Sequence, residues 1–317
     1  MKVTEHLANR THTPVSFEIL PPLKGKSIQS VYRILDQLME FNPPFINVTY
    51  HRAEFKYKQL DNGLFEKVHI RKRPGTVGIC AAIMYKYGVD AVPHLVCGGF
   101  SRAETEDALV DLHYLGINNV LLLRGDAVKP ETKFVPEPKG NKNALELVQQ
   151  TVNMNNGIYL EEDLTNGFKT DFCIGVAGYP EKHIEAPNLK ADLQYLKQKV
   201  DAGAHYIVTQ MFFDNQKFMA FEKACRSIGI TVPIIPGLKP ITRKLQIHTL
   251  PSAFNICLPE DLTDAIAACP TDEAAEQAGI EWTIEQCKQL LAYGVPCLHF
   301  YTMSNAHSVQ QIMKGVG

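Results

Sequence analysis

Polar side chains able to do chemistry follow short apolar runs throughout this chain of 317 residues. The clearest case is the segment 119–126, where an apolar run precedes Arg124, Gly125 and Asp126. A cation, a glycine and a carboxylate at the end of a buried parallel strand stand where α/β proteins bind their ligands. Further polar residues in or just after such runs are Glu18, Thr49, His94, Tyr179, His183, Gln210 and Tyr301.

Each of these residues taken alone has an ordinary explanation. The segment 119–126 could be a plain strand and turn, Glu18 could lie at an exposed edge, and His94 could be a hydrogen-bonded core histidine. Gln210 could cap a strand. Their joint placement favours a shared site, because the catalytic groups of barrel enzymes come from several strand ends.

The apolar pattern predicts the elements that position these residues. Strands are expected over 15–20, 45–49, 89–97, the run ending before Arg124, 172–178, 205–211, 232–236 and 297–302. Helices are expected from Ser27, over 76–88, from the capping box of Ser101 and Glu104 to Gly116, and over 144–154, 188–203 and 215–228. The segment 241–293 is expected to be helical with interruptions at Pro251, Pro259 and Pro270.

Eight strands alternating with helices predict an α/β fold in which residues 1–317 form a single (β/α)8 TIM barrel. A doubly wound open sheet is the alternative, but neither glycine-rich nucleotide fingerprint supports it. Two segments are expected to be loops. The first is a basic region that includes residues 69–73, and it is interpreted as a solvated face. The second is the segment 127–141, which is rich in Pro, Lys and Glu.

The helix expected over 188–203 carries a polar stripe beside its apolar face. Leu189, Leu193, Leu196 and Val200 are expected to face inward. Asp192, Tyr195 and Lys199 are spaced i, i+3 and i+7, so they share one side of the helix. A solvated stripe is the plain interpretation, and a ligand contact is the functional one.

Composition points to a small-molecule partner. The net charge of −2 gives no electrostatic reason to expect nucleic acid or an acidic membrane surface. The eight cysteines form no pair at zinc-site spacing, so we expect reduced thiols and no metal. No leader-like or membrane-length apolar run occurs, and we expect a cytoplasmic protein, assembled as a homo-oligomer.

Several motifs resemble those of the catalytic domain of the methylenetetrahydrofolate reductase family. They include SFEILPP at 16–22, LRGD at 123–126, AGYPEKHIEA at 177–186, TQMFF at 209–213 and HFYT at 299–302, and they cover nearly the whole chain. The resemblance implies a (β/α)8 barrel that holds FAD at the carboxyl ends of its strands. It also implies a ping-pong reaction in which NADH or NADPH reduces the flavin, and 5,10-methylenetetrahydrofolate is then reduced to 5-methyltetrahydrofolate.

The resemblance implies roles for individual residues. Glu18 is the expected general acid, and we expect a partly apolar pocket to raise its pKa. Asp126 is expected beside the flavin ring, and Gln210 and Tyr301 are expected to contact substrate together with Glu18 and Asp126. The implied FAD contacts are Thr49, His94, Leu123, Arg124, Gly125, Asp126, Tyr179, His183, Asp192, Tyr195 and Lys199. Of these, Arg124 and Lys199 supply cations to the pyrophosphate, and Asp192 accepts from ribose hydroxyls.

The chain departs from the family pattern at a few positions. Met303, Ser304 and Asn305 stand where many members have Leu-Asn-Arg, and Gln198 stands where an arginine is frequent. Asn143 lies near an expected aromatic FAD contact, and the residues 50–52 replace a smaller glycine-containing turn. These departures affect individual expected contacts to FAD and folate more than the expected reaction. We also expect no adenosylmethionine-binding regulatory domain of the eukaryotic kind.

Two other functions are compatible with a barrel of this type. A pterin-binding methyltransferase would hold folate without a flavin, so the purified protein would be colourless. Another flavin barrel, similar to proline dehydrogenase, would be reduced by an amino acid and not by NADH.

Overall fold

The computed structural model describes residues 1–127, 133–303 and 305–317. Its main sheet has the order β10-β11-β1-β2-β5-β6-β7-β8-β9, and every neighbouring pair in it is parallel. The strands are β1 (Val15–Ile19), β2 (Phe45–Val48), β5 (Asp90–Val96), β6 (Asn119–Leu123), β7 (Cys173–Gly178), β8 (Tyr206–Thr209), β9 (Ile234–Ile235), β10 (Gly237–Leu238) and β11 (Leu298–Met303). All eight predicted strands are therefore confirmed in position.

The sheet closes through a strand that is divided at Pro236. On one side of this proline β9 pairs with β8, and on the other side β10 pairs with β11. Proline has no N–H to donate to a ladder, and so the predicted strand at 232–236 is split in two. The proline carbonyl still accepts from the backbone N–H of His299 at 3.1 Å. The predicted (β/α)8 barrel is confirmed, and the open-sheet alternative is wrong.

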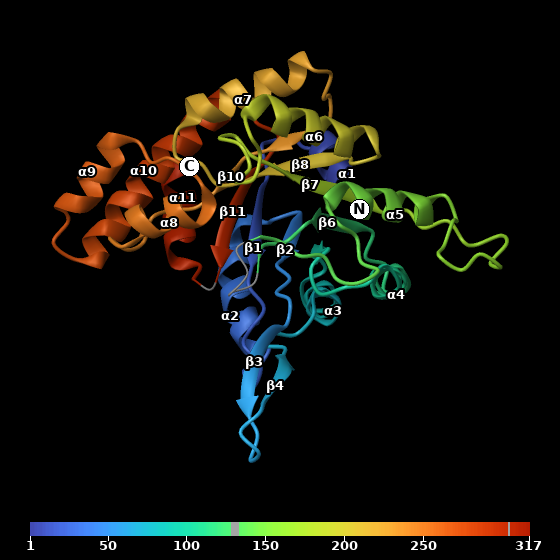
Figure 1. Cartoon of the computed structure of the whole chain (residues 1–317). Helices are drawn as coiled ribbons and strands as arrows, with labels where there is room; N and C mark the ends of the chain where they lie inside the picture. The colour runs from blue at the N-terminus through green and yellow to red at the C-terminus, as the bar shows by residue number, and fades with distance from the viewer. Residues whose placement is uncertain (128–132, 304) are drawn as a thin grey trace.

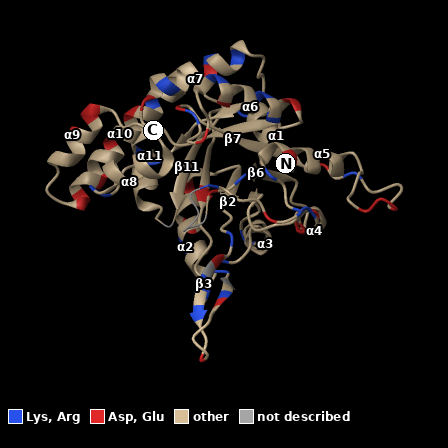
Figure 2. Ribbon diagram, in the orientation of Figure 1, with Lys and Arg blue, Asp and Glu red and all other residues tan. Residues whose placement is uncertain are grey.

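Helices surround the sheet (Figure 1). Those that alternate with the strands are α2 (Gln29–Leu38), α3 (Thr76–Tyr87), α4 (Arg102–Tyr114), α5 (Ala144–Asn155), α6 (Leu189–Asp201), α7 (Asn215–Ser227) and α10 (Asp272–Tyr293). The others are α1 (Val3–Ala8), α8 (Gln246–Phe254), α9 (Glu260–Ala268), α11 (His307–Val316) and the short 3-10 turn η1 (Met39–Phe41). Acidic and basic residues are interspersed over the outer helices, as Figure 2 shows.

Two local predictions about these helices are wrong. Pro251 lies inside α8 instead of interrupting it, whereas Pro259 and Pro270 stand between helices as expected. Leu189 is the first residue of α6 and is 38% exposed, whereas Leu193 and Leu196 further along the helix are buried. The capping box of Ser101 and Glu104 is confirmed by reciprocal hydrogen bonds.

The segment expected to be a basic loop is instead largely a β-hairpin. β3 (Glu54–Gln59) and β4 (Phe65–Ile70) pair antiparallel, and Gly63 in the connection has a φ of +80°. Figure 1 shows this ribbon projecting from the rest of the molecule. Tyr57 and Leu64 are 60% and 64% exposed, so a search for buried apolar runs did not find this ribbon in the sequence. The predicted loop at 127–141 is irregular where it is described, and 128–132 lie outside the described residues.

The amino end of the barrel is closed by apolar packing. Val3 and Leu7 of α1 belong to the same buried cluster as Phe45, Leu121 and other inward-facing strand residues. The side chain of Asn119 accepts from the backbone N–H of Val3 at 2.8 Å. Polar groups for ligand binding are therefore found at the opposite, carboxyl end of the strands.

Candidate active site

Glu18 lies between two imidazoles at the carboxyl end of β1. Its Oε2 is 3.4 Å from Nε2 of His94 and 3.7 Å from Nε2 of His299. All three side chains are buried, and neither Nε2 has a partner of normal hydrogen-bond geometry in the described chain. Nδ1 of His299 is held by the hydroxyl of Ser16 at 2.8 Å. The strands β1, β5 and β11 thus assemble one carboxylate and two imidazoles.

The expected direction of the Glu18 pKa is wrong. Burial raises the pKa of this carboxyl, but the neighbouring His94 and His299, together with the ammonium of Lys239, lower it by more, and the net shift is downward. Burial also lowers the pKa of His94, partly offset by Glu18. The sequence argument considered only the apolar strand environment, whereas the fold brings three basic groups from distant segments to this carboxyl.

The other residues expected at the substrate lie at the same end of the barrel. Tyr301 on β11 donates its hydroxyl to the carbonyl of Thr209 at 2.5 Å. Gln210 follows β8 and accepts from the N–H of Met211 through Oε1 at 2.9 Å. Asp126 is exposed after β6. The pKa of Tyr301 is raised by burial and then by the charge of Glu18, so the phenol stays neutral near this carboxylate.

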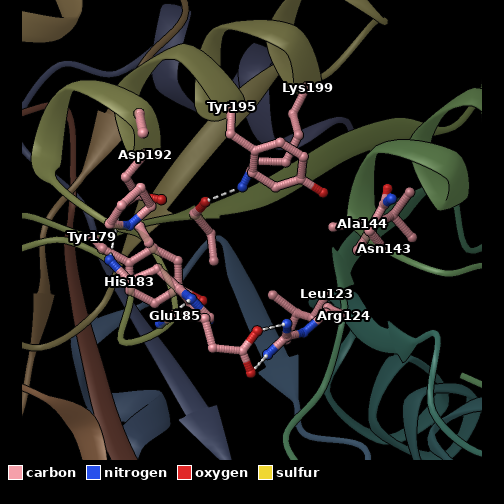
Figure 3. Close-up of a pocket in the computed structure, with 15 residues that line it drawn as sticks. Leu123, Arg124, Asn143, Ala144, Tyr179, His183, Glu185, Asp192, Tyr195 and Lys199 are labelled. Atoms are coloured by element: carbon pink, nitrogen blue, oxygen red, sulfur yellow. Dashed lines mark hydrogen bonds and ion pairs between the residues drawn. The ribbon is translucent and has the colours of Figure 1, made fainter. Parts of the chain in front are cut away.

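A cavity of about 290 Å³ lies at the same end of the barrel, between the ends of β6 and β7 and helix α6. Figure 3 shows its side chains pointing toward a common space. The expected residues that line it are Leu123, Arg124, Tyr179, His183, Asp192, Tyr195 and Lys199. The expected residues that do not line it are Glu18, Thr49, His94, Gly125, Asp126, Gln210 and Tyr301.

Lys199 is a buried cation in this cavity. It is 4% exposed, and its Nζ donates to the carbonyl of Ala177 at 2.6 Å. Burial lowers the pKa of Lys199 to about 8, against a smaller opposing effect of Asp192. The interpretation of this stripe as solvated is therefore wrong at Lys199. Gln198, its neighbour in sequence, is exposed and points elsewhere.

Arg124 and Glu185 form an ion pair across the same cavity (Figure 3). Both guanidinium ends take part, and Nη2 donates to Oε1 of Glu185 at 2.9 Å. The guanidinium lies 5.0 Å from the centre of the Phe134 ring. The Arg124 hydrogen bonds lower the pKa of Glu185, so this carboxylate remains ionised. Arg124 is thus held in the cavity by a residue that sequence reasoning did not single out.

The remaining wall combines aromatic rings with helix-capping groups. Tyr179 and His183 pack edge to face, with ring centres 4.8 Å apart. Asp192 accepts from the backbone N–H of His183 at 2.8 Å. Across the cavity, the Tyr195 hydroxyl accepts from the N–H of Leu145 at 3.3 Å. Asn143 also lines the cavity. Its side-chain oxygen accepts from the N–H of Glu146 at 3.1 Å and thereby caps helix α5.

Two buried polar groups in or just after β2 have no partner within the described ranges. They are the hydroxyl of Thr49 and the side-chain amide of Asn47. The unsatisfied hydroxyl of Thr49 follows β2, close in the sheet order to Glu18 on β1. A buried polar atom without a partner is costly, and at the mouth of a barrel it indicates a ligand contact.

Sequence reasoning missed Glu185, Ser16, His299 and Lys239. Ser16, Glu185 and His299 lie within motifs quoted from the sequence. Residue type alone did not indicate which side chains they would contact in the fold. His299 follows Cys297 in a buried run and looks like a core residue. Only the parallel register, which places His299 opposite Ser16, brings it beside Glu18.

Comparison with known sequences decides the family. A family model described as methylenetetrahydrofolate reductase matches residues 2–317. The chain belongs to the methylenetetrahydrofolate reductase family. A family member from Salmonella typhimurium, named 5,10-methylenetetrahydrofolate reductase, is 31% identical over 304 residues, covering 96% of this chain and 90% of that protein.

Larger members of the family are similar over part of their length. The probable methylenetetrahydrofolate reductase (NADPH) of Caenorhabditis elegans is 31% identical, covering 99% of this chain and 43% of that protein. Methylenetetrahydrofolate reductase (NADH) 1 of Arabidopsis thaliana is 33% identical, covering 100% of this chain and 51% of that protein. The chain therefore spans about half the length of these two relatives.

A solved structure supports the fold. An uncharacterized protein from Clostridium thermocellum, described as binding two copies of 5-methyl-5,6,7,8-tetrahydrofolic acid, has a TM-score of 0.58 at 13% identity. The match covers 98% of this chain and 96% of that chain. Within the described parts of the reductase-family chain, no helix is long and apolar enough to span a bilayer, and no group of His, Cys, Asp or Glu could hold a metal ion.

Proposed function

We propose that the chain catalyses the reduction of 5,10-methylenetetrahydrofolate to 5-methyltetrahydrofolate by NADH or NADPH, with FAD as cofactor. The observation that carries this proposal is the placement of Glu18 between two imidazoles, at the same barrel mouth as a cavity containing Arg124 and Lys199. The family membership and the names of its relatives support the same reaction. The names of those relatives include both NADH and NADPH, and neither donor is favoured here.

The cavity fits part of a flavin dinucleotide. Its volume of about 290 Å³ lies near the small end of ligand sites, which suits one nucleoside portion with the remainder extending across the barrel mouth. Arg124 and Lys199 supply two positive charges for a pyrophosphate, and Asp192 supplies an acceptor for hydroxyls. The unpartnered hydroxyl of Thr49 supplies a polar contact toward the barrel centre. When bound, FAD would accept a hydride from the nicotinamide and return it to the folate.

Within this proposal, the first task of the protein is to open the imidazolidine ring of the folate. The bond between the methylene carbon and N10 breaks, its electron pair moves to N10, and N10 takes a proton from Glu18. The methylene carbon is left as an iminium on N5, ready to accept a hydride. A positioned acid accelerates such a step by roughly 10²- to 10⁴-fold.

The lowered pKa of Glu18 reflects the basic groups around it, which outweigh its burial. When a carboxylate and an imidazole interact strongly, they titrate as a pair. We assign the proton donor to Glu18, with His94 and His299 as its neighbours, and Ser16 fixes the ring orientation of His299 by its hydrogen bond to Nδ1 at 2.8 Å. The two imidazoles lie 3.4 and 3.7 Å from Oε2 of Glu18 and can restrict the orientation of its carboxyl.

Asp126 and Gln210 complete the proposed substrate site. Asp126 supplies a fixed negative charge at the end of β6, which stabilises the folate cation as it forms. Gln210 presents an amide that can contact the folate and the nicotinamide in turn. Because both substrates use one site, the order is ping-pong, with the oxidised nicotinamide leaving before the folate binds.

An anaerobic titration tests the proposal. The purified protein is expected to be yellow and to lose its flavin absorbance when NADH or NADPH is added. Addition of 5,10-methylenetetrahydrofolate should restore that absorbance and yield 5-methyltetrahydrofolate. A colourless protein, or a reduced flavin that the folate leaves unchanged, would overturn the proposed reaction.

A further inference from the structure

The loop after β7 is irregular and forms one wall of the cavity. It spans residues 179–187, and we refer to it as the cavity loop. Tyr179 and His183 lie side by side on this wall, with ring centres 4.8 Å apart (Figure 3). The residues of the loop that line the cavity are Tyr179, His183, Glu185, Ala186 and Pro187. An irregular segment depends on side-chain contacts for its position, since it lacks the regular hydrogen bonds of a helix or a sheet.

The backbone of Lys182 is strained near the centre of the cavity loop. Its φ of +84° lies in the left-handed region that side chains other than glycine rarely adopt. A residue stays in such a conformation only when the surrounding structure enforces it. Nζ of Lys182 donates to the carbonyl of Ala186 at 3.0 Å and to that of His183 at 3.3 Å. These two bonds fold the loop on itself, so they do not attach it to the rest of the protein.

Glu181, the neighbour of Lys182 in sequence, attaches the cavity loop to two other segments. Its Oε2 accepts from Nζ of Lys217 on α7 at 2.8 Å. The same oxygen accepts from the backbone N–H of Cys257, between α8 and α9, at 2.9 Å. Oε1 is buried and has no partner in the part of the chain that the structure describes, so both attachments depend on one oxygen. Glu181 therefore joins three segments that are far apart in the sequence.

A carboxylate in a nearly buried position makes this attachment. The side chain of Glu181 is 9% exposed, whereas that of Lys217 is 36% exposed. Hydrogen bonds to an ionised acceptor are shorter and stronger than those between neutral groups. The partial exposure of Lys217 weakens its share of the attachment through solvent screening. The cavity loop is thus anchored to α7 by Glu181 and to α6 by Asp192, which accepts from the N–H of His183 at 2.8 Å.

We propose that Glu181 positions the cavity loop for the dinucleotide, although it is outside the set of described residues that line the cavity. This inference rests on the proposed function, in which the cavity holds part of FAD. Glu181 lies two residues after Tyr179 and two before His183, so a shift of its carboxylate moves the backbone that carries both rings. Binding is tighter when a site has its bound shape beforehand, because less ordering remains to be done. Glu181 is thus a positioning residue, and it acts through Lys217 and the N–H of Cys257.

Hydrogen exchange on the full chain without cofactor tests the attachment itself. Glu181→Gln keeps the shape of the side chain and removes its charge. The backbone N–H groups of Lys182 and Ala186 donate to carbonyls inside the loop, at 3.1 and 3.0 Å. Their exchange is expected to become about threefold to tenfold faster, the scale of one hydrogen bond. Glu222→Gln is the matched control, because it removes a carboxylate that pairs with Arg226 inside α7. It should leave exchange in the cavity loop unchanged.

Equilibrium titration with FAD tests the consequence for the cofactor. Glu181→Gln and Lys217→Met are each expected to raise the FAD dissociation constant about threefold to tenfold. The double variant should bind no more weakly than the weaker of the two single variants, because both substitutions break the same contact. A variant that merely destabilised the fold would lower the urea midpoint of the apoprotein and leave the FAD dissociation constant unchanged.

Three results would overturn the positioning role. Unchanged exchange in Glu181→Gln would remove the attachment. Faster exchange with an unchanged FAD dissociation constant would limit Glu181 to a structural role, and so would an equal effect of Glu222→Gln on FAD binding. Additive losses in the double variant would show that Glu181 does not act through Lys217. If the unmodified protein bound no FAD, the proposed cofactor would be wrong and the positioning role would fall with it, whereas the exchange data would still report on the attachment.

Discussion

The carboxylate of Glu18 lies 3.4 Å from the imidazole of His94, although the two residues belong to strands separated by β2. Both side chains are buried at the barrel mouth. This relationship gives the proposed reaction its most specific requirement, a carboxyl group whose position is restricted by a neighbouring imidazole. It also yields the first of the predictions below.

Replacing Glu18 with glutamine should separate the two half-reactions. Gln keeps the shape of the side chain but cannot pass on a proton, so reoxidation of the flavin by methylenetetrahydrofolate should slow by about 10²- to 10⁴-fold. Flavin reduction by NADH should be largely unchanged. Rapid-mixing measurements of each half-reaction check this, and an equal loss in both would contradict a folate-specific acid role.

Removal of the buried cation should weaken cofactor binding. Lys199→Ala is expected to raise the FAD dissociation constant about tenfold to a hundredfold, the scale of hydrogen bonds to charged groups. Lys197→Ala is the matched control, because Lys197 lies on the same helix and pairs with Asp201 at the surface. FAD release on dilution provides the measurement. Unchanged retention in the Lys199 variant would remove its phosphate assignment.

The pKa of Lys199, lowered to about 8 by burial, predicts a pH dependence of FAD binding. Below this pKa the free protein already carries the charge, so the dissociation constant should be flat. Above it a proton must be taken up on binding, and the dissociation constant should rise by up to about tenfold per pH unit. Lys199→Ala should abolish the rise, whereas the permanently charged Lys199→Arg should stay flat. A wild-type profile without a bend near this pH would contradict the prediction.

Glu185 should compete with the cofactor for Arg124. Glu185→Gln removes the charge of a partner whose side chain is 43% exposed, so FAD binding should tighten modestly, by about twofold to fivefold. The gain should shrink at high salt, because exposed charges are screened. Equilibrium titration at two ionic strengths measures both effects. Weaker binding in this variant would show that Glu185 positions Arg124 for the ligand.

Close packing inside the barrel should make Gly175 intolerant of a side chain. A Cβ at this position would lie 2.3 Å from Cζ of Tyr206, so Gly175→Ala is expected to cost about 1–3 kcal/mol of unfolding free energy. Gly78→Ala is the control, because nothing lies within 4 Å of the added Cβ. Alanine favours the helix more than glycine does, so this substitution should raise the unfolding free energy by about 0.5–1 kcal/mol. Urea denaturation distinguishes these outcomes; equal midpoints would contradict the packing argument.

The sequence predicted the barrel because its strands are buried on both faces. Runs such as 172–178 read as continuously apolar, and they appear as β7 with nearly the expected bounds. The hairpin at 54–70 was not found in this way, because the short alternation of Phe55 and Tyr57 with lysines is unlike the continuous apolar runs of the barrel strands. The division at Pro236 likewise depends on which neighbours each half-strand meets.

The site was predictable in its residue types but not in its electrostatics. Position in or after a strand was enough to select Glu18 and Arg124 as candidates, and spacing along one helix selected Lys199. The direction of the Glu18 pKa depends on His299 and Lys239, which are more than 200 residues away in the chain. Periodicity carries no information about such distant pairings, which arise only when the barrel closes.

Both cations of the cavity are already satisfied by the chain, Lys199 by a carbonyl and Arg124 by Glu185. Burying a charge without a partner would be costly, and here that cost is avoided before any dinucleotide arrives. The two charges therefore need no ligand in order to be buried in the folded chain. Under the proposed function, binding of the dinucleotide would exchange these internal partners for phosphate oxygens.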